Sequence, residues 1–487
     1  MNDQKFRNHP TVIINNIVAV AFILFITCIS IPNIDLIMIS IFLLILALAT
    51  GIFILAWRRT TITFEKDQIV VEHNLIYLKR KTIPYAKIAS VNVVRNIFNR
   101  IFGTTTVNIN INSSKNAAIP EASFAFRSEL ANKIRSDLSS KIFEIEYTSE
   151  EDENFESVAI FTPKDVLIHG LLATSTWQLI YTFILLIYSV LSIVYGSAGG
   201  LIAAISLLII GELIPVMSLI LKFYNFKVYR VGDNIRIQNG AIQTYRTSFD
   251  VSRINAIRIR RPFFARLLHK SCLEAEVVGI NAAAKDTKPT LCLLIDDDKM
   301  EGIMKQLVPE FLYEPNMTIQ PKKAIFPLLS KTSIAAFVFL IIMAYPCYWM
   351  YTNAGNFNLT NNYAQLLVQH LPIICTLIVI LALYWGALIS YKVRQFGLGI
   401  DMFTMINGIL DRETVTMQYD RVQITKLSAS MMAKRFNLAR CTVSLLSSVG
   451  EKRITSGYFY TEELEEVGKI VLDRLSNGKY DYRKTAI

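Results

Sequence analysis

The sequence has few of the residues that build metal sites and catalytic centres. Its 487 residues include five histidines and six cysteines, with no C-x-x-C pair, no zinc spacing and no H-E-x-x-H motif. Neither a P-loop, nor a G-x-S-x-G turn, nor a catalytic dyad can be identified. We therefore expect no metal, no cofactor, no catalytic residues and no disulfide framework, and we predict that the protein is not an enzyme.

Positive charge is absent from three long stretches. No Lys or Arg occurs in Thr11–Trp57, Asp165–Leu221 or Thr332–Tyr391, although the chain contains 50 of these residues. Hydrophobic residues make up 52% of the sequence and the mean hydropathy is +0.38, which is more apolar than a soluble protein. Apolar runs of about 20 residues can cross the hydrocarbon core of a bilayer as helices. These stretches therefore predict an integral membrane protein.

Six apolar runs meet this length and occur in three pairs, so each pair is expected to form a helical hairpin. Because Lys and Arg flank every pair on one side, the positive-inside rule places both termini and the segments between pairs in the cytoplasm. The net charge of +11 is then explained by cytoplasmic segments that lie beside the anionic inner leaflet, and no nucleic acid partner is expected. The predicted transmembrane helices are Thr11–Ile31, Leu36–Trp57, Leu167–Tyr195, Leu201–Leu221, Ser333–Tyr351 and Leu366–Tyr391.

The three segments that follow the apolar pairs are copies of one another. A shift of 166 residues carries the first onto the second, and 168 carries the second onto the third, so that Lys87, Arg253 and Arg421 coincide. Each copy begins with the alternation typical of a β-hairpin and ends with an amphipathic helical run. The predicted hairpins are Thr60–His73, Lys227–Gly240 and Leu398–Ile409, and the predicted helices are Arg127–Leu138, Lys299–Val308 and Thr461–Leu475.

The repeated segment IASVNVVRNIFNRIFG (Ile88–Gly103) has looser copies in INAIRIRRPFFARLLHK (Ile254–Lys270) and VQITKLSASMMAKRFNL (Val422–Leu438). This pattern resembles the bacterial PH-like domains of the second type. The alternation of apolar pairs with such units is similar to the YdbT-like membrane proteins over essentially the whole chain. The resemblance implies seven-stranded bent barrels with capping helices and a smaller PH-like companion. It also implies a role in envelope homeostasis or in susceptibility to membrane-active peptides.

The predicted fold class is a multi-pass α-helical membrane protein with six transmembrane helices in three hairpins. It carries three cytoplasmic PH-like β-barrel domains, each capped by a C-terminal helix. The expected hairpin segments are 1–57, 164–221 and 321–391, and the expected PH-like domains are 58–163, 222–320 and 392–487.

One loop in each copy combines cations with aromatic residues. Such a loop can bind lipid phosphates or an acidic partner while its rings enter the membrane interface. Alternatively, its cations only mark a surface that faces the anionic inner leaflet. The candidate binding residues are Arg258, Arg260, Arg261, Phe263, Phe264, Arg266 and Lys270 in the second copy, Arg95 and Arg100 in the first, and Lys434 and Arg435 in the third.

Glu212 stands near the middle of the predicted fourth span, where an ionised carboxylate is costly. It is therefore expected to be protonated or paired, with Tyr181, Thr182 and Tyr384 as candidate partners. Two interpretations stay open, a structural polar clamp and the polar residue of a conduit.

Together these features predict a non-enzymatic membrane scaffold whose PH-like units recognise partners at the inner leaflet. The expected partners are anionic lipids and either the smaller companion or a second copy of the chain. The alternative is a lipid or small-molecule conduit through the six-helix bundle.

Overall fold

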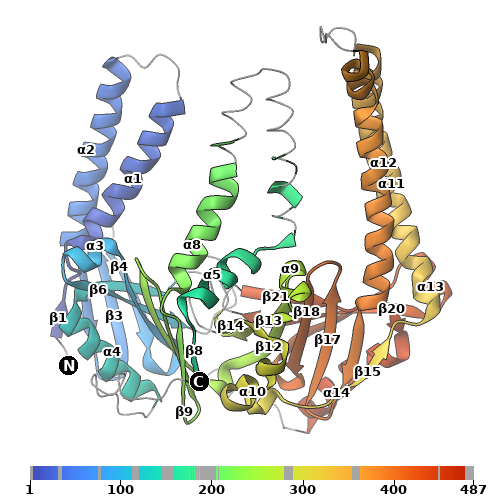
Figure 1. The fold of residues 1–487 in the computed structure, drawn as a ribbon. Helices are drawn as coiled ribbons and strands as arrows, with labels where there is room; N and C mark the ends of the chain where they lie inside the picture. The colour runs from blue at the N-terminus through green and yellow to red at the C-terminus, as the bar shows by residue number, and fades with distance from the viewer. Residues whose placement is uncertain are drawn as a thin grey trace.

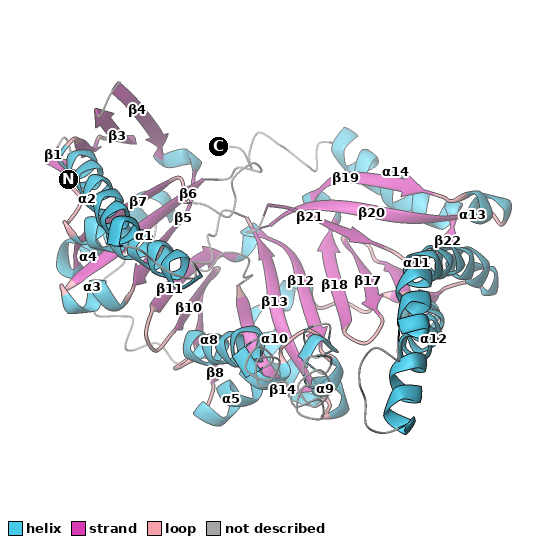
Figure 2. Ribbon diagram, turned by 90° about the horizontal axis from the view of Figure 1, so that it is seen from above, coloured by secondary structure: helices cyan, strands magenta, loops and turns pink. Residues whose placement is uncertain are grey.

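The computed structural model describes residues 4–30, 36–74, 78–111, 120–143, 158–176, 208–278, 289–353, 362–447 and 450–477, with isolated positions between 177 and 207. Helices rise from one side of a row of β-sheets (Figure 1). Seen from above, the strands of the second half lie side by side along this row (Figure 2). Three consecutive units build the row, each with strands first and a helix last.

Unit one comprises residues 4–143. The first strand after the apolar helices shows the alternation of burial typical of a strand: Ile62 and Phe64 point into the core, while Thr61 and Thr63 are half-buried. The predicted hairpin Thr60–His73 is confirmed, with Thr60 opposite His73. The elements are β1 (Gln4–Phe6), β2 (Thr60–Phe64), β3 (Gln68–Asn74), β4 (Leu78–Pro84), β5 (Ile88–Arg95), α3 (Ile97–Ile101), β6 (Thr104–Ile111), β7 (Ala122–Arg127) and α4 (Ser128–Phe143).

Unit two (residues 159–307) and unit three (residues 316–476) repeat this order, and their predicted hairpins are also confirmed. Unit two consists of β8 (Ala159–Ile160), β9 (Lys227–Val231), β10 (Asn234–Asn239), β11 (Thr244–Asp250), β12 (Ile254–Arg261), α9 (Phe263–Leu267), β13 (Lys270–Val277), β14 (Thr290–Asp296) and α10 (Asp297–Leu307). Unit three consists of β15 (Asn316–Ile319), β16 (Gln395–Leu398), β17 (Met402–Gly408), β18 (Arg412–Gln418), β19 (Val422–Ser428), α13 (Met431–Arg435), β20 (Leu438–Ser447), β21 (Gly450–Thr455), β22 (Phe459–Tyr460) and α14 (Thr461–Ser476).

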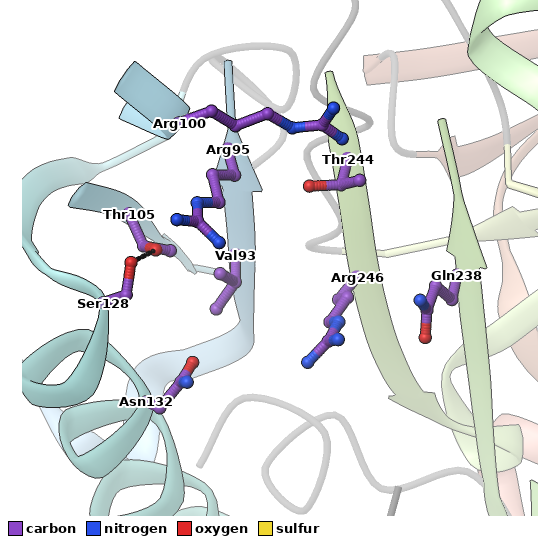
Figure 3. Close-up of a pocket in the computed structure, with 9 residues that line it drawn as sticks. All are labelled: Val93, Arg95, Arg100, Thr105, Ser128, Asn132, Gln238, Thr244 and Arg246. Atoms are coloured by element: carbon purple, nitrogen blue, oxygen red, sulfur yellow. Dashed lines mark hydrogen bonds between the residues drawn. The ribbon is translucent and has the colours of Figure 1, made fainter. Parts of the chain in front are cut away.

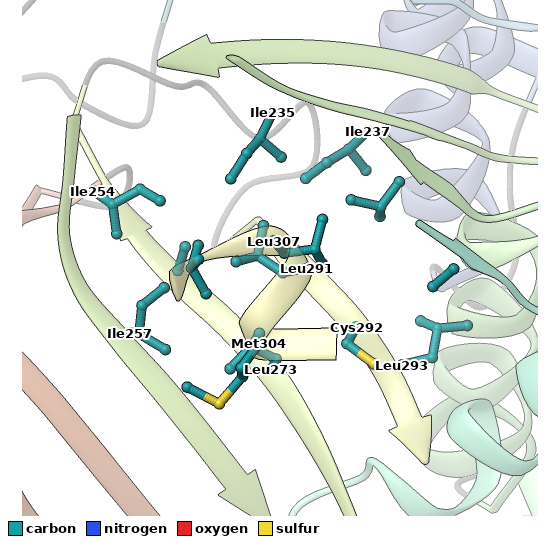
Figure 4. Close-up of a cluster of buried hydrophobic side chains, with 14 of the residues drawn as sticks. Ile235, Ile237, Ile254, Ile257, Leu273, Leu291, Cys292, Leu293, Met304 and Leu307 are labelled. Atoms are coloured by element: carbon teal, nitrogen blue, oxygen red, sulfur yellow. The ribbon is translucent and has the colours of Figure 1, made fainter. Parts of the chain in front are cut away.

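Each unit has its own hydrophobic core, which its last helix covers. In unit two, Ile235 and Leu273 come from different sheets and gather with Met304 and Leu307 of α10 (Figure 4). Helix α4 buries Ile134 in unit one, and α14 covers the core of unit three in the same way. A fully buried side chain of this size contributes roughly 1.5–3 kcal/mol. The predicted amphipathic runs are therefore confirmed as capping helices.

The apolar helices are inserted between two paired strands of a unit. The strand before each insertion pairs with the first strand after it: β1 with β2, β8 with β9, and β15 with β16. Both ends of each insertion are thus held by one sheet. The inserted elements are α1 (Thr11–Ser30) and α2 (Leu36–Arg58), then α5 (Pro163–Leu172), the π-helix η3 (Ile209–Leu213) and α8 (Ile214–Phe223), and finally α11 (Ile325–Asn353) and α12 (Asn362–Val393).

The prediction of six transmembrane helices is wrong. Across the described residues, three helical stretches are long and apolar enough to cross a membrane, Ile37–Arg58, Lys322–Asn353 and Gln369–Val393. Two further apolar helical stretches, Thr11–Ala21 and Ile214–Phe223, are shorter.

The second apolar pair departs from the prediction at its start, because hydropathy counts apolar residues and does not detect where a helix ends. Helix α5 ends at Leu172, inside the predicted span Leu167–Tyr195. Just beyond it, the backbone N–H of Thr176 donates to Asp411 of unit three (3.0 Å). The π-helix η3 and helix α8 follow each other directly over residues 209–223, and most of the predicted span before them lies outside the described residues.

Of the four sheets that the described strands form, two continue from one unit into the next. Strand β5 pairs antiparallel with β11, where Arg95 lies opposite Thr244. Strand β12 pairs with β18 through six residue pairs, ending with Arg261 opposite Arg412. Each junction builds a seven-stranded sheet, and only the outer sheets, with four strands each, belong to a single unit. The prediction of three PH-like β-barrel domains is therefore corrected, because the described strands form sheets that neighbouring units share, which pairs edges that would otherwise be open.

Candidate functional site

The three cationic loops of the sequence form one repeated local structure. In each unit a strand ends, a five-residue helix follows (α3, α9 or α13), and a turn leads into the next strand. Side chains of Asn96 and Ser430 cap α3 and α13 by accepting from backbone N–H groups. The turn places Gly103, His269 and Asn437 at positive φ, between 52° and 63°. These equivalent residues show that the repeat extends to backbone conformation.

The short helices lie beside the bases of the apolar insertions. Asn96 at the start of α3 donates to Asn15 of α1 (3.3 Å). The rings of Phe436, after α13, and Phe326, in α11, stack at 5.3 Å. Ala265 of α9 packs in a small buried cluster with Ala173, directly after α5. Each cationic loop therefore occupies the end of its unit from which the apolar helices leave (Figure 1).

Large apolar side chains are exposed on these loops. Ile101 is 70% exposed in unit one, and Met431 is 92% exposed in unit three. In unit two the rings of Phe263 and Phe264 meet edge to face at 5.3 Å, and Phe264 is the exposed member. The other exposed members of this set are Phe102, Leu267, Leu268 and Met432. Exposed apolar side chains therefore recur on the short-helix loop of each of the three units.

The cations of the unit two loop are largely engaged within the chain. Arg258 is 3% exposed and binds two carboxylates, Glu276 (2.8 Å) and Glu413 of unit three. Arg260 lies 3.8 Å from Glu274. The carboxylates therefore neutralise much of the charge that the sequence places on this loop.

The remaining cations of the loop have partners as well. Arg261 lies 3.2 Å from Asp297, and Lys270 binds Asp296 at 2.6 Å. The hydrogen bond from Lys270 lowers the pKa of the Asp296 carboxyl. Arg266 donates to the backbone carbonyl of Leu410 in unit three (2.9 Å) and lies over the Phe263 ring. Asp296 and Asp297 thus pair with cations at the start of α10.

The outer two loops differ from the middle one. Arg100 of unit one and Lys434 and Arg435 of unit three are exposed, and none forms an ion pair within the described parts of the chain. The solvent-facing cations of the three loops are therefore concentrated in units one and three.

A cavity of about 500 Å³ lies where unit one meets unit two (Figure 3). It includes Arg95 and Arg100, both candidates from the sequence, and adds Arg246 of β11, which sequence reasoning missed. No local motif marks Arg246, because only the pairing of β5 with β11 brings it opposite Val93. The lining residues are Val93, Arg95, Arg100, Thr105, Ser128, Asn132, Gln238, Thr244 and Arg246.

Comparison with known proteins decides the family. The family described as Bacterial PH domain matches residues 17–141, 176–305 and 325–475, well over half of the chain. The chain belongs to the bacterial PH domain family. It is also similar to the UPF0699 transmembrane protein YdbT of Bacillus subtilis (strain 168), with 22% identity over 431 residues, which cover 82% of this chain and 83% of that protein. No solved structure matches it.

These matches confirm the predicted resemblance to YdbT-like bacterial PH proteins. They also support a membrane-associated protein, since the apolar helices agree with the transmembrane description of the relative. The short-helix loops described above fall inside all three matched segments. The loops are thus a recurring part of this bacterial PH domain architecture.

Glu212 lies in η3, and its side chain is outside the described residues. Two of its candidate partners are bound elsewhere: Thr182 donates to the carbonyl of Gln178 (3.0 Å), and Tyr384 pairs with Ser333 (2.8 Å). In the described residues, no three His, Cys, Asp or Glu side chains gather as a metal site.

Proposed function

We propose that this bacterial PH protein is a non-enzymatic membrane scaffold whose short-helix loops rest at the headgroup level of the inner leaflet. One observation carries the proposal. Three equivalent helices lie beside the bases of the apolar insertions and expose large apolar side chains such as Ile101, Phe264 and Met431. Apolar side chains next to exposed cations suit a membrane interface, where rings and aliphatic chains bury while charges meet lipid phosphates.

In this arrangement the three loops contribute differently. The unit two loop would bind mainly through Phe264, Leu267 and Leu268, because the acidic partners within the chain neutralise its cations. The outer loops would add attraction to anionic lipid through Arg100, Lys434 and Arg435. The cytoplasmic placement of the units follows from the positive-inside rule and is part of the proposal.

The shared sheets support a platform rather than three independent modules. Strand pairing at both junctions fixes the units relative to one another, so the loops approach the membrane as one set. We propose that this platform acts in envelope homeostasis or affects susceptibility to membrane-active peptides. A smaller PH-like companion or a second copy of the chain would be its protein partner.

The test compares two exposed positions at opposite ends of unit three. Met431 lies on α13, beside α11. Ile400 is 89% exposed in the turn after β16, and this strand starts directly after α12, so the turn lies at its far end. Met431→Cys and Ile400→Cys are each labelled with an environment-sensitive dye in full-length protein in nanodiscs.

The dye at position 431 should show blue-shifted emission and quenching by spin-labelled lipid, whereas the dye at 400 should show neither. Cys375 is exposed, so it is replaced by Ser in both variants. The parent without an introduced cysteine supplies the background. Equal quenching at the two positions, or none at 431, would refute the placement of the loops at the headgroups.

A further inference from the structure

The cavity between units one and two is cationic. Its three arginines come from both units, Arg95 and Arg100 from unit one and Arg246 from unit two. Among the described residues, nine line the cavity; none of these is acidic, and the others are polar apart from Val93. Within the described residues, neither Arg95 nor Arg246 forms an ion pair. Such a set of guanidinium groups is suited to an anion, because each can donate several hydrogen bonds in a plane.

Arg95 is the most constrained of the three arginines. It ends β5, and its backbone is fixed by the strand pair with Thr244. Its Nε atom is buried and has no hydrogen-bond partner among the described residues. Figure 3 shows the Arg95 side chain on the cavity side of β5, in the direction of Thr105 and Ser128.

The second junction of the chain provides an internal comparison. Arg261 ends β12 as Arg95 ends β5, and Arg412 lies opposite it as Thr244 lies opposite Arg95. Asp297 starts α10 as Ser128 starts α4. The backbone N–H of each residue that starts the helix donates to the positive-φ residue of its own unit, Ser128 to Gly103 (3.0 Å) and Asp297 to His269 (2.9 Å).

The two junctions differ in charge at this equivalent position. In the second junction, Asp297 pairs with Arg261 at 3.2 Å, so the chain supplies its own anion. In the first, the residue in that place is Ser128, whose hydroxyl is bound to Thr105 (2.9 Å). The first turn of α4 also borders the cavity, and the positive end of a helix dipole favours an anion.

We propose that the first junction is a binding site for a phosphate-bearing ligand, whose oxygens take at Arg95 the place that Asp297 takes at Arg261. Arg246 and Arg100 bind the same anion from the other strand and from α3. A cavity of 500 Å³ is larger than one phosphate group, so it accepts the rest of a small molecule or a lipid headgroup. A lipid can reach the site because α3, which carries Arg100, lies beside α1.

The test uses full-length protein and two probes. Inorganic pyrophosphate is titrated into protein in phosphatidylcholine nanodiscs, and native mass spectrometry measures the retention of phosphatidylglycerol from mixed nanodiscs. Ser128→Asp should form the Arg95 ion pair internally and weaken binding by about 10-fold or more, the effect of losing a charge-assisted hydrogen bond. Ser128→Asn, which changes size without adding charge, should keep most of the affinity.

Arg95→Met and Arg246→Met should each weaken binding to a similar extent. Arg261→Met is the matched control, since Arg261 ends β12 as Arg95 ends β5, and its loss at the second junction should leave binding unchanged. Binding of pyrophosphate alone would identify a free phosphorylated ligand, and selective retention of phosphatidylglycerol would identify a lipid. The absence of both, or equal losses in Ser128→Asn and Ser128→Asp, would overturn the proposal.

Discussion

The buried ion network at the second junction allows a quantitative prediction. Arg258 binds Glu276, which is fully buried and also accepts a hydrogen bond from Ser447 of unit three (2.5 Å). The same guanidinium binds Glu413 of unit three. This network therefore links β12 and β13 of unit two to β18 and β20 of unit three. Its removal should open the junction before it affects the unit cores.

Arg258→Met leaves Glu276 buried without its cationic partner. Removing one member of a buried ion pair typically costs about 3–5 kcal/mol, because the remaining charge stays desolvated. The double variant Arg258→Met with Glu276→Gln removes both charges and should recover most of this loss. Arg261→Met is the matched control, because its partner Asp297 is partly exposed and such a pair contributes about 1 kcal/mol or less.

Hydrogen exchange of β12 and β18 is the suitable assay, because a multi-unit protein does not unfold in two states and local opening is measured directly. Exchange should accelerate across the junction in Arg258→Met and return towards the parent rate in the double variant. Unit one should exchange at the parent rate throughout. Parent-like protection of β12 in Arg258→Met would refute a structural role for this arginine and leave it available as a ligand-binding cation.

Three further predictions follow from particular residues. Burial, with the positive charges of Arg260 and Lys222, lowers the pKa of His169 from 6.5 to about 3. Between pH 6.5 and about pH 3, only the unfolded chain binds this proton. The free energy of unfolding should therefore fall by roughly 1.4 kcal/mol per pH unit as the pH drops below 6.5. Thermal unfolding at pH 7 and 5 should show this loss in the parent and less of it in His169→Gln. Gly240→Ala should reduce the yield of folded protein, since φ is +110° and a Cβ would lie 1.8 Å from a backbone oxygen. Thiol labelling of intact cells should modify Thr352→Cys at the outer end of α11 but not Ile400→Cys; the reverse pattern would contradict the cytoplasmic orientation.

The sequence alone determined the local elements and the repeat. The alternation in Thr60–Phe64 and the amphipathic run that begins at Thr461 recur in their copies, and both became the expected strands and capping helices. These signals are local, because a strand repeats every two residues and a helix every 3.6. The repeat is also visible in the backbone, because Gly103, His269 and Asn437 all have positive φ.

Hydropathy predicted less than the repeat did. It identified the apolar stretches that become α2, α11 and α12, because length and composition suffice for a long uninterrupted helix. It failed where α5 ends at Leu172, because just beyond this end Thr176 donates to Asp411 of a distant unit, a contact that hydropathy does not include.

Only the tertiary structure decided which edges meet and which charges remain available. The pairs β5 with β11 and β12 with β18 depend on how whole units stack, and no local pattern specifies them. Arg258 appears in the sequence as part of a basic cluster, yet its partner Glu413 lies 155 residues away. Arg95 has the same strand position as Arg261 but lacks its acidic neighbour, because the chain places Ser128 where unit two has Asp297. At the second junction Arg261 is therefore paired with Asp297, whereas at the first junction Arg95 has no ion-pair partner among the described residues, and only long-range strand pairing places Arg246 beside it.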